Sequence, residues 1–281
     1  MDFVLKGNLC YSGSPECLTT LPGGYLIYAG GVCKGAYPVL PEQYAGLPVT
    51  DYGDRLILPG FCDLHVHAPQ FAYRGLGMDL ELIAWLNTRA FPEESKYADL
   101  EYADRAYDLF ADAMRKSATT RLSCFATLHA PATLLLMQKL EATGLKGYVG
   151  KVNMNRHSPE NLCECDAQTA AAETEAWVRE SRDRFTAIQP IITPRFIPSC
   201  TDTLMEKLSA IARRYDVPLQ SHLSENHEEI RWVRELCPHS DGYADAYDHF
   251  GMLTPGTILA HVVYPEAEEI ELLKERGVMV A

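Results

Sequence analysis

From about residue 57 onward, short apolar runs alternate with amphipathic stretches, and this alternation restricts the possible folds more than any other feature. The stretch 201–215, for example, places Leu204, Leu208, Ile211 and Ala212 on one face of a helix. A strand-then-helix order that repeats along a chain is typical of a parallel sheet covered by helices. The strand candidates are RLILPGFCDLHVH, TTRLSCFAT, GYVGKVNM, TAIQPIIT, VPLQSHLS, GTILAHVV and GVMVA, and the helix candidates are 101–116, 131–143, 166–183, 201–215, 226–237 and 265–276.

Seven strand candidates predict an α/β fold, a (β/α)8 TIM-type barrel. A doubly wound sheet is the alternative, but no Gly-rich phosphate loop follows the first strand. Residues 1–56 differ from the rest, since they are rich in Gly, Pro and Tyr and contain short β-like pieces. We therefore expect a small β-sandwich-like domain over 1–56 and a barrel domain, with strands one to seven, over 57–281.

The composition bounds the partners and the compartment. Lysine and arginine number 25 against 38 aspartates and glutamates, so the net charge of −13 argues against unassisted binding to nucleic acid or to an anionic membrane. No apolar run reaches transmembrane length, and the N-terminus MDFVLKGNLC does not resemble a signal peptide. Nine cysteines without CxxC spacing suit a reducing compartment, so we expect a cytoplasmic location.

Four histidines stand at the ends of three predicted strands. His65 and His67 close the first, His222 the fifth and His261 the sixth. In a barrel the carboxyl ends of the strands meet at one rim, so these imidazoles are expected to converge there. Neutral imidazoles are ligands for zinc, which lowers the pKa of water toward about 7. Glu225, three residues after His222, stands where a general acid/base can reach such a water molecule.

Other histidines have plainer interpretations. A single histidine at a strand end is more often a hydrogen-bonded core residue than a ligand, and only the joint pattern favours a metal site. His129, at the end of the second strand candidate, is a candidate for lining the same rim. The HEE of His227–Glu229 fits the HxE of the cytidine-type deaminases, but their PCxxC partner is absent, so this alternative is rejected.

With these residues in view, the chain resembles the amidohydrolase superfamily and, within it, the guanine deaminases. PGFCDLHVH is the general signature of the superfamily. The narrower resemblance is carried by HAPQF, DLELIAWLNTRAFPEE, GKVNM, ITPRFIPSC, QSHLSEN and LAHVVY, which follow from about residue 55 in the order and spacing of those enzymes.

The resemblance implies a hydrolase acting on the C–N bond of a cyclic amidine, with zinc-dependent deamination of guanine to xanthine and ammonia in purine catabolism. It implies one zinc ion per chain, although imidazole ligands suit iron as well. A small purine base is then the partner, and a homodimer is plausible. The implied metal ligands are His65, His67, His222 and His261, the last being either a ligand or a base. The implied catalytic residues are Glu225 as proton shuttle and His261. The implied substrate-binding residues are His67, Gln70, Arg195, Phe196, His222 and Glu225.

Two pocket residues have structural alternatives. Arg195 can instead pair with a carboxylate, and Phe196 can belong to the core. Trp85 and Phe91 are expected in a lid or in the core rather than in direct contact with a ligand. An alternative function for the whole chain is that of a related amidohydrolase, which would deaminate a different purine, a pterin or a triazine ring.

The resemblance also implies an eighth strand that ends in a metal-binding aspartate, and the sequence stops at ERGVMVA, the seventh strand candidate. We interpret this as a shortened gene model, with a fragment completed by another chain and a non-catalytic barrel as the alternatives. The predicted function is that of a complete protein, and we expect little or no turnover from these 281 residues alone.

Overall fold

The computed structural model describes residues 1–281, and the chain divides into two compact units, Met1–Phe61 and Cys62–Ala281. The observed division lies five residues after the predicted one. Each unit is described by itself.

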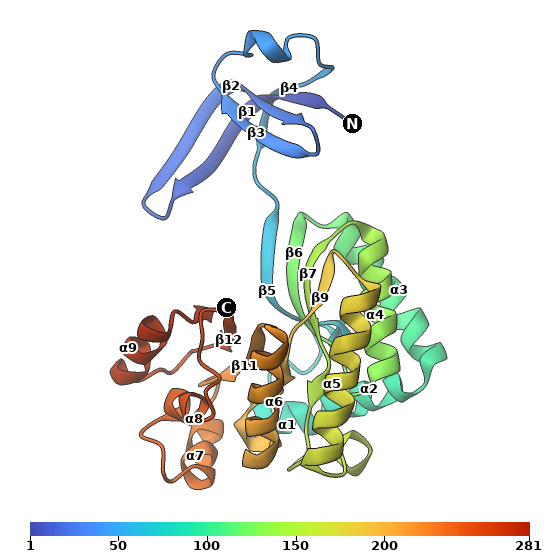
Figure 1. Ribbon diagram of the computed structural model, residues 1–281, viewed down its shortest axis with the longest axis vertical. Coiled ribbons are helices and arrows are strands. Elements are labelled where there is room, and N and C mark those ends of the chain that lie inside the picture. Colours follow the sequence, from blue (N-terminus) through green and yellow to red (C-terminus); the bar gives the residue numbers. More distant parts are fainter. The chain divides into compact units, whose positions relative to one another are not determined.

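The first unit is one four-stranded sheet in the order β3-β2-β1-β4. Its strands are β1 (Phe3–Ser14), β2 (Cys17–Ala29), β3 (Val32–Tyr37) and β4 (Val49–Ile57), with the 3-10 helix η1 (Glu42–Tyr44) before β4. Strands β1, β2 and β3 pair antiparallel, whereas β4 runs parallel to β1. The sequence predicted a sandwich-like domain, which needs two sheets. In the structure all four strands of this unit join one sheet, so no strand is left to form a second (Figure 1).

The second unit contains the parallel strands. β5 (Phe61–His67), β6 (Thr119–Phe125), β7 (Lys146–Gly150) and β9 (Ile188–Pro190) form one sheet in that order. The short strands β8 (Val152–Asn153) and β10 (Thr193–Pro194) pair parallel, as do β11 (Leu219–Leu223), β12 (Thr257–His261) and β13 (Met279–Val280). A parallel bridge joins Leu219 of β11 to Ile192, which lies between β9 and β10. Each of the seven strand candidates therefore contains a strand.

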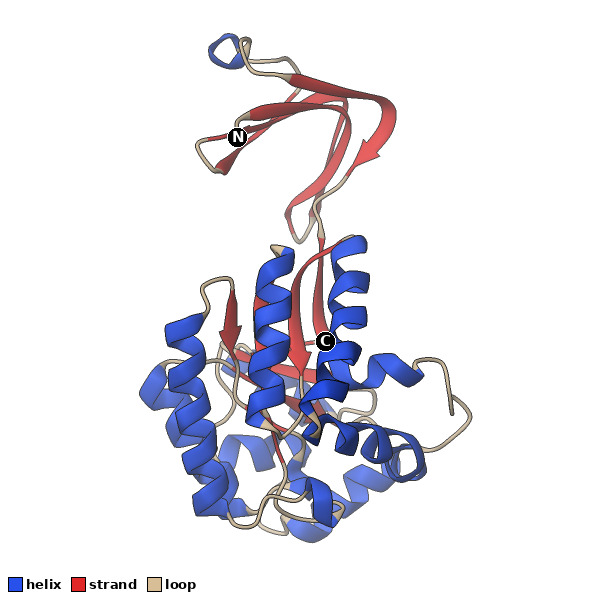
Figure 2. Ribbon diagram, turned by 90° about the vertical axis from the view of Figure 1, so that its right-hand side faces the viewer, coloured by secondary structure: helices blue, strands red, loops and turns tan.

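Helices follow the strands in the predicted order. They are α3 (Leu100–Lys116), α4 (Ala130–Thr143), α5 (Ala167–Arg184), α6 (Asp202–Tyr215), α7 (His227–Leu236), α8 (Tyr243–His249) and α9 (Ala267–Arg276). Six of these seven begin and end within two residues of the predicted stretches, and the seventh, α8, was not predicted. Helices α3 to α6 contact one another in sequence order, and Figure 2 shows long helices packed beside the strands. None of the helices has the length and apolar character needed to cross a bilayer.

Local sequence explains where the helices start. Asp166 accepts hydrogen bonds from the backbone N–H groups of Gln168 and Thr169, and Asn226 begins α7 with a capping box that includes Glu229. Between these helices and the strands lies a core whose largest buried side chains include Trp177, Phe110, Leu136 and Leu140. This packing fixes the strand ends that carry the histidines.

The connection from β5 to α3 is made of short helical pieces. They are η2 (Ala68–Tyr73), α1 (Leu82–Trp85), the π-helix η3 (Leu86–Ala90), α2 (Phe91–Glu94) and η4 (Ser95–Ala98). π-Helical turns are rare and occur frequently at functional sites. Here the segment Leu82–Glu94 supplies part of the wall of the pocket described next.

Candidate metal and active site

The four histidines singled out in the sequence lie together. His65 and His67 are alternate residues of β5 and therefore project to one face. Strands β11 and β12 pair in parallel with Leu223 opposite His261, so His222 and His261 emerge from neighbouring strand ends. The ring centroid of His65 lies 4.9 Å from that of each of the other three.

Three of these imidazoles can hold one metal ion. His65, His67 and His222 each offer a nitrogen, and the three nitrogens lie within 4.8 Å of one another. The Nε2 atoms of His67 and His222 are 3.0 Å apart. Two nitrogens at about 2.0–2.1 Å from one zinc ion can be at most about 4.2 Å apart. The separation of His67 and His222 lies within that limit, and three neutral imidazoles are a donor set that zinc accepts. His261 lies outside this three-residue group.

The protonation states favour ligation. Burial holds the pKa of His65 down to about 3, and burial likewise holds those of His67 and His222 well below the usual value. These imidazoles are therefore neutral at pH 7. The Nδ1 atom of His222 lies 2.6 Å from the backbone carbonyl oxygen of Arg195, which can only accept. Nδ1 must carry the proton, which leaves a lone pair on Nε2, the atom turned toward His67.

Glu225 lies beside His261, with 3.4 Å between Oε2 and Nε2. Burial, and secondly the charge of Glu229, raise the pKa of the Glu225 carboxyl to about 7. A carboxyl with this pKa can both take up and release a proton at neutral pH. The backbone around the pair is strained, because Ser224, His261 and Val262 have φ values of 51°, 78° and 48°. Such left-handed conformations are costly for side-chain-bearing residues and concentrate at functional sites.

The same cavity contains the predicted purine-binding residues. It has a volume of about 110 Å³, and it is lined by His65, His67, Gln70, Leu82, Trp85, Leu86, Arg195, Phe196, His222, Glu225 and His261. Drug-sized ligands occupy about 300–1,000 Å³, so this cavity suits a smaller molecule. Trp85, expected in a lid or in the core, belongs to the wall. Phe196 lines the cavity while remaining only 6% exposed, so it also belongs to the core.

The sequence analysis allowed for Arg195 pairing with a carboxylate, but it did not identify the residue that supplies one. Glu94 accepts two hydrogen bonds from the guanidinium, at 2.6 Å and 3.1 Å, and both side chains are buried. The guanidinium also lies over the ring of Phe91, 5.2 Å from its centroid. Glu94 is the last residue of DLELIAWLNTRAFPEE, a stretch that the sequence analysis singled out without relating it to Arg195.

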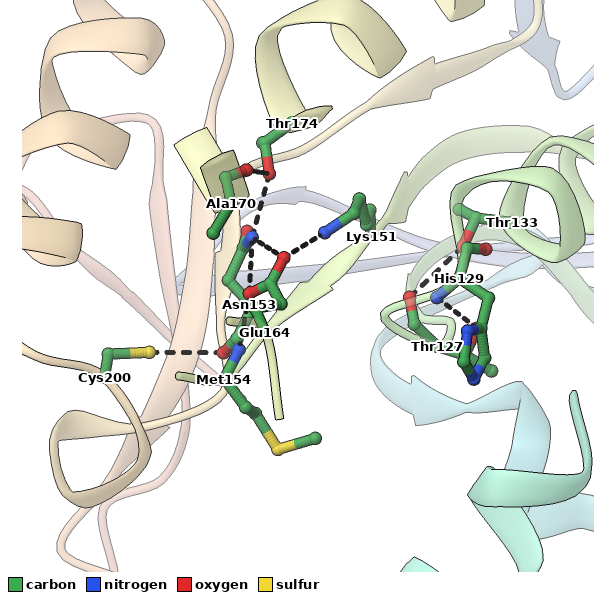
Figure 3. Close-up of polar contacts among 10 residues, drawn as sticks. All are labelled: Thr127, His129, Thr133, Lys151, Asn153, Met154, Glu164, Ala170, Thr174 and Cys200. Carbon is green, nitrogen blue, oxygen red and sulfur yellow. Dashed lines mark hydrogen bonds and ion pairs between the residues drawn. The ribbon is translucent and has the colours of Figure 1, made fainter. Parts of the chain in front are cut away.

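A second buried network joins Lys151, Asn153 and Glu164 (Figure 3). Lys151 and Glu164 form an ion pair of 2.6 Å, and Glu164 also accepts hydrogen bonds from the Asn153 side chain. The carbonyl oxygen of Asn153 then accepts the backbone N–H of Arg195 and the thiol of Cys200. No pattern in the sequence indicated this pair.

The remaining histidines lie elsewhere. His129, proposed for the rim, precedes α4 and borders a separate hollow beside Trp177. The ring of His157 packs at a tilt against Trp232, and that of His227 packs at a tilt against Tyr264. None of them lines the histidine-rich cavity.

Comparison with known proteins agrees with this geometry. Residues 56–281 match the model of the amidohydrolase family, and the chain belongs to that family. The fold class predicted from the sequence is thereby confirmed.

Among the relatives, the named enzymes share one activity. The chain is 41% identical to the probable guanine deaminase of Schizosaccharomyces pombe over 79% of its own length and 43% of the relative. It is 40% identical to the guanine deaminase of Dictyostelium discoideum over 83% of its length and 52% of the relative. The chain thus spans about half the length of the curated relatives it matches.

A solved structure extends the similarity to the whole chain. The guanine deaminase of C. acetobutylicum, with guanine bound in its active site, superposes with a TM-score of 0.95 and 38% identity. That match covers all of this chain and 67% of the other.

Proposed function

We propose that the chain carries the metal centre and the purine pocket of a guanine deaminase. Such an enzyme uses water to hydrolyse guanine to xanthine and ammonia. The observation that supports this most is the convergence of two sets of residues on one small cavity. Three neutral imidazoles and Glu225 line it together with Gln70 and Arg195. Relatives at about 40% identity are named for this activity.

The proposed metal is zinc, held by His65, His67 and His222. When bound, it supplies Lewis acidity that lowers the pKa of a water molecule toward about 7. The carbonyl oxygen of Arg195 keeps His222 in the tautomer that ligation needs. His261 is either a fourth ligand or a base, since its ring lies 4.9 Å from that of His65 and its Nε2 lies 3.4 Å from Oε2 of Glu225.

The protein groups divide the remaining tasks. Glu225 takes one proton from the attacking water and gives it to the ring nitrogen. It then takes the second proton, that of the added hydroxyl, and gives it to the leaving amine, which departs as ammonia. The amide of Gln70 and the guanidinium of Arg195 satisfy acceptors on the edge of the base. Phe196 provides an aromatic wall.

The test is guanine loss, followed by ultraviolet absorption, in the natural polypeptide that contains these residues. We expect turnover that stops when a chelator removes the metal and returns with zinc. Turnover that survives complete metal removal contradicts the proposal. A kcat/KM for pterin or triazine rings above that for guanine assigns the site to a sibling activity.

Two further predictions belong with this function. We propose a cytoplasmic homodimer, on the basis of the nine free cysteines and of the resemblance to the guanine deaminases. Light scattering with chromatography measures the mass, and fractionation of the source cells locates the protein.

A further inference from the structure

The guanidinium of Arg195 is fixed on two sides. Its two terminal nitrogens donate to the two carboxylate oxygens of Glu94, at 2.6 Å and 3.1 Å, and Phe91 covers one face. The side chains of Arg195 and Glu94 are only 4% and 1% exposed. Bidentate pairing of this kind fixes the plane of the guanidinium and neutralises its charge.

Arg195 and Glu94 differ in their access to the cavity. Arg195 lines it, together with Leu82, Trp85 and Leu86, whereas Glu94 does not. Glu94 therefore acts through Arg195. It stands at the end of the continuous segment that supplies those three wall residues, so the wall and the carboxylate are placed by one piece of chain.

We infer that Glu94 is a positioning residue that turns Arg195 into a fixed donor without net charge, and that the pair makes the site select an uncharged base over an anionic ring. This inference rests on the proposed function, and it names a selectivity for that same site. Arg195 still has N–H groups that Glu94 does not use, and these can donate to a neutral carbonyl oxygen. An anionic ring brings a charge into the buried site, where Glu94 already balances the guanidinium, so its desolvation is not compensated.

The alternative is a purely structural role, in which the pair only holds α2 against the residue that follows β10. Measurements of fold stability do not separate the two readings, because breaking a buried ion pair is destabilising in either case. The charge preference does separate them. An unbalanced guanidinium should attract an anion, whereas a purely structural pair has no effect on which ring binds.

The experiment measures binding by calorimetry at pH 7 with zinc-loaded protein. All variants carry Glu225→Gln, so that guanine is not consumed. The probes are guanine, which is neutral, and urate, a purine that carries a ring anion at this pH. The test variant is Glu94→Gln. The matched control is Glu93→Gln, because Glu93 is the adjacent, comparably buried carboxylate but pairs with Lys96 and not with Arg195.

We expect Glu94→Gln to weaken guanine binding at least tenfold and to strengthen urate binding at least tenfold, with zinc content unchanged. Glu93→Gln should alter neither affinity. If the ratio of the two affinities in Glu94→Gln equals that of its parent, the inference is overturned, whether or not both affinities have fallen.

Two outcomes need a separate interpretation. If the parent does not bind guanine, the proposed function fails, but the change in urate affinity still decides the role of Glu94. If Glu94→Gln does not fold, Glu94→Asp replaces it. Aspartate keeps the negative charge, but its side chain is one methylene shorter, so it holds the guanidinium less firmly. Guanine should therefore bind more weakly, while urate binding stays the same because the charge is unchanged. Guanine binding equal to that of the parent then overturns the inference.

Discussion

The Nδ1 atom of His222 donates to the backbone carbonyl oxygen of Arg195 over 2.6 Å. Arg195 therefore contributes to the cavity in two ways. Its main chain orients a candidate metal ligand, and its side chain lines the proposed purine pocket. A change in the backbone at Arg195 should disturb metal and base binding together.

Replacing His222 with asparagine should lower zinc affinity at least tenfold, because it removes one of three converging nitrogens. Loss of a group that merely supports a ligand already costs about 10–100-fold. Metal titration with a competing chelator measures the change. His157→Asn is the control, since His157 packs against Trp232 outside the cavity. Equal zinc affinity in both variants contradicts the ligand assignment.

Glu225→Gln should reduce kcat for guanine by about 100-fold or more, because general acid–base catalysis typically contributes about 10²–10⁴-fold. Zinc content should not change, since Glu225 is not part of the ligand group. Stopped-flow absorbance and elemental analysis provide the two measurements. Glu228→Gln, three residues further along on an exposed position, should behave like the parent. Retained turnover in Glu225→Gln removes this residue from the mechanism.

Lys151→Met should destabilise the second unit by about 3–5 kcal/mol, because it leaves the carboxylate of Glu164 buried without its cation. Urea denaturation followed by circular dichroism gives the free energy of unfolding. Lys146→Met serves as control, since this lysine is exposed on β7. A loss below about 1 kcal/mol, the range of an exposed pair, means that the ion pair is worth little here.

Glu141 provides a pH-dependent prediction. Its partial burial alone would raise the pKa, but backbone N–H donors of Thr186, Ala187 and Ile188 outweigh this and lower it. A carboxyl with a lowered folded pKa contributes stability above its unfolded pKa, and that contribution is lost as the pH falls through the folded value. Glu141→Gln should therefore cost about 1 kcal/mol at pH 7, after allowance for its exposure.

That difference should shrink below the unfolded pKa of Glu141 and disappear once the pH has fallen through the lower folded pKa. Denaturation of parent and variant from pH 7 down to pH 3 measures it. Glu180→Gln, which removes an exposed carboxylate paired with Arg184, should show almost no difference at any pH. A constant difference across the range contradicts the assigned role of the charge.

Much of the fold could be predicted because its signals are local. Apolar runs of strand length and amphipathic helices are determined by residues close together in the sequence. The N-caps Asp166 and Asn226 are examples for the helices. The meeting of His65, His67, His222 and His261 also followed from local sequence, because the carboxyl ends of parallel strands share one rim. Their roles as ligands and base stay predictions.

The missed features depend on side chains that meet only in three dimensions. Glu94 and Arg195 are separated by 101 positions, and no periodicity relates them. Lys151 and Glu164 are closer in sequence, but Glu164 lies in an irregular connection whose path no short pattern specifies. The helix α8 is too short for its apolar spacing to be distinguished from a loop.

The continuous path from Leu82 to Glu94 has a consequence for protein engineering. Because one uninterrupted stretch builds a side of the cavity and also supplies the counter-ion of Arg195, it can be exchanged as a cassette between related enzymes. Grafting this cassette without its terminal glutamate would transfer the shape of the wall but not its charge balance.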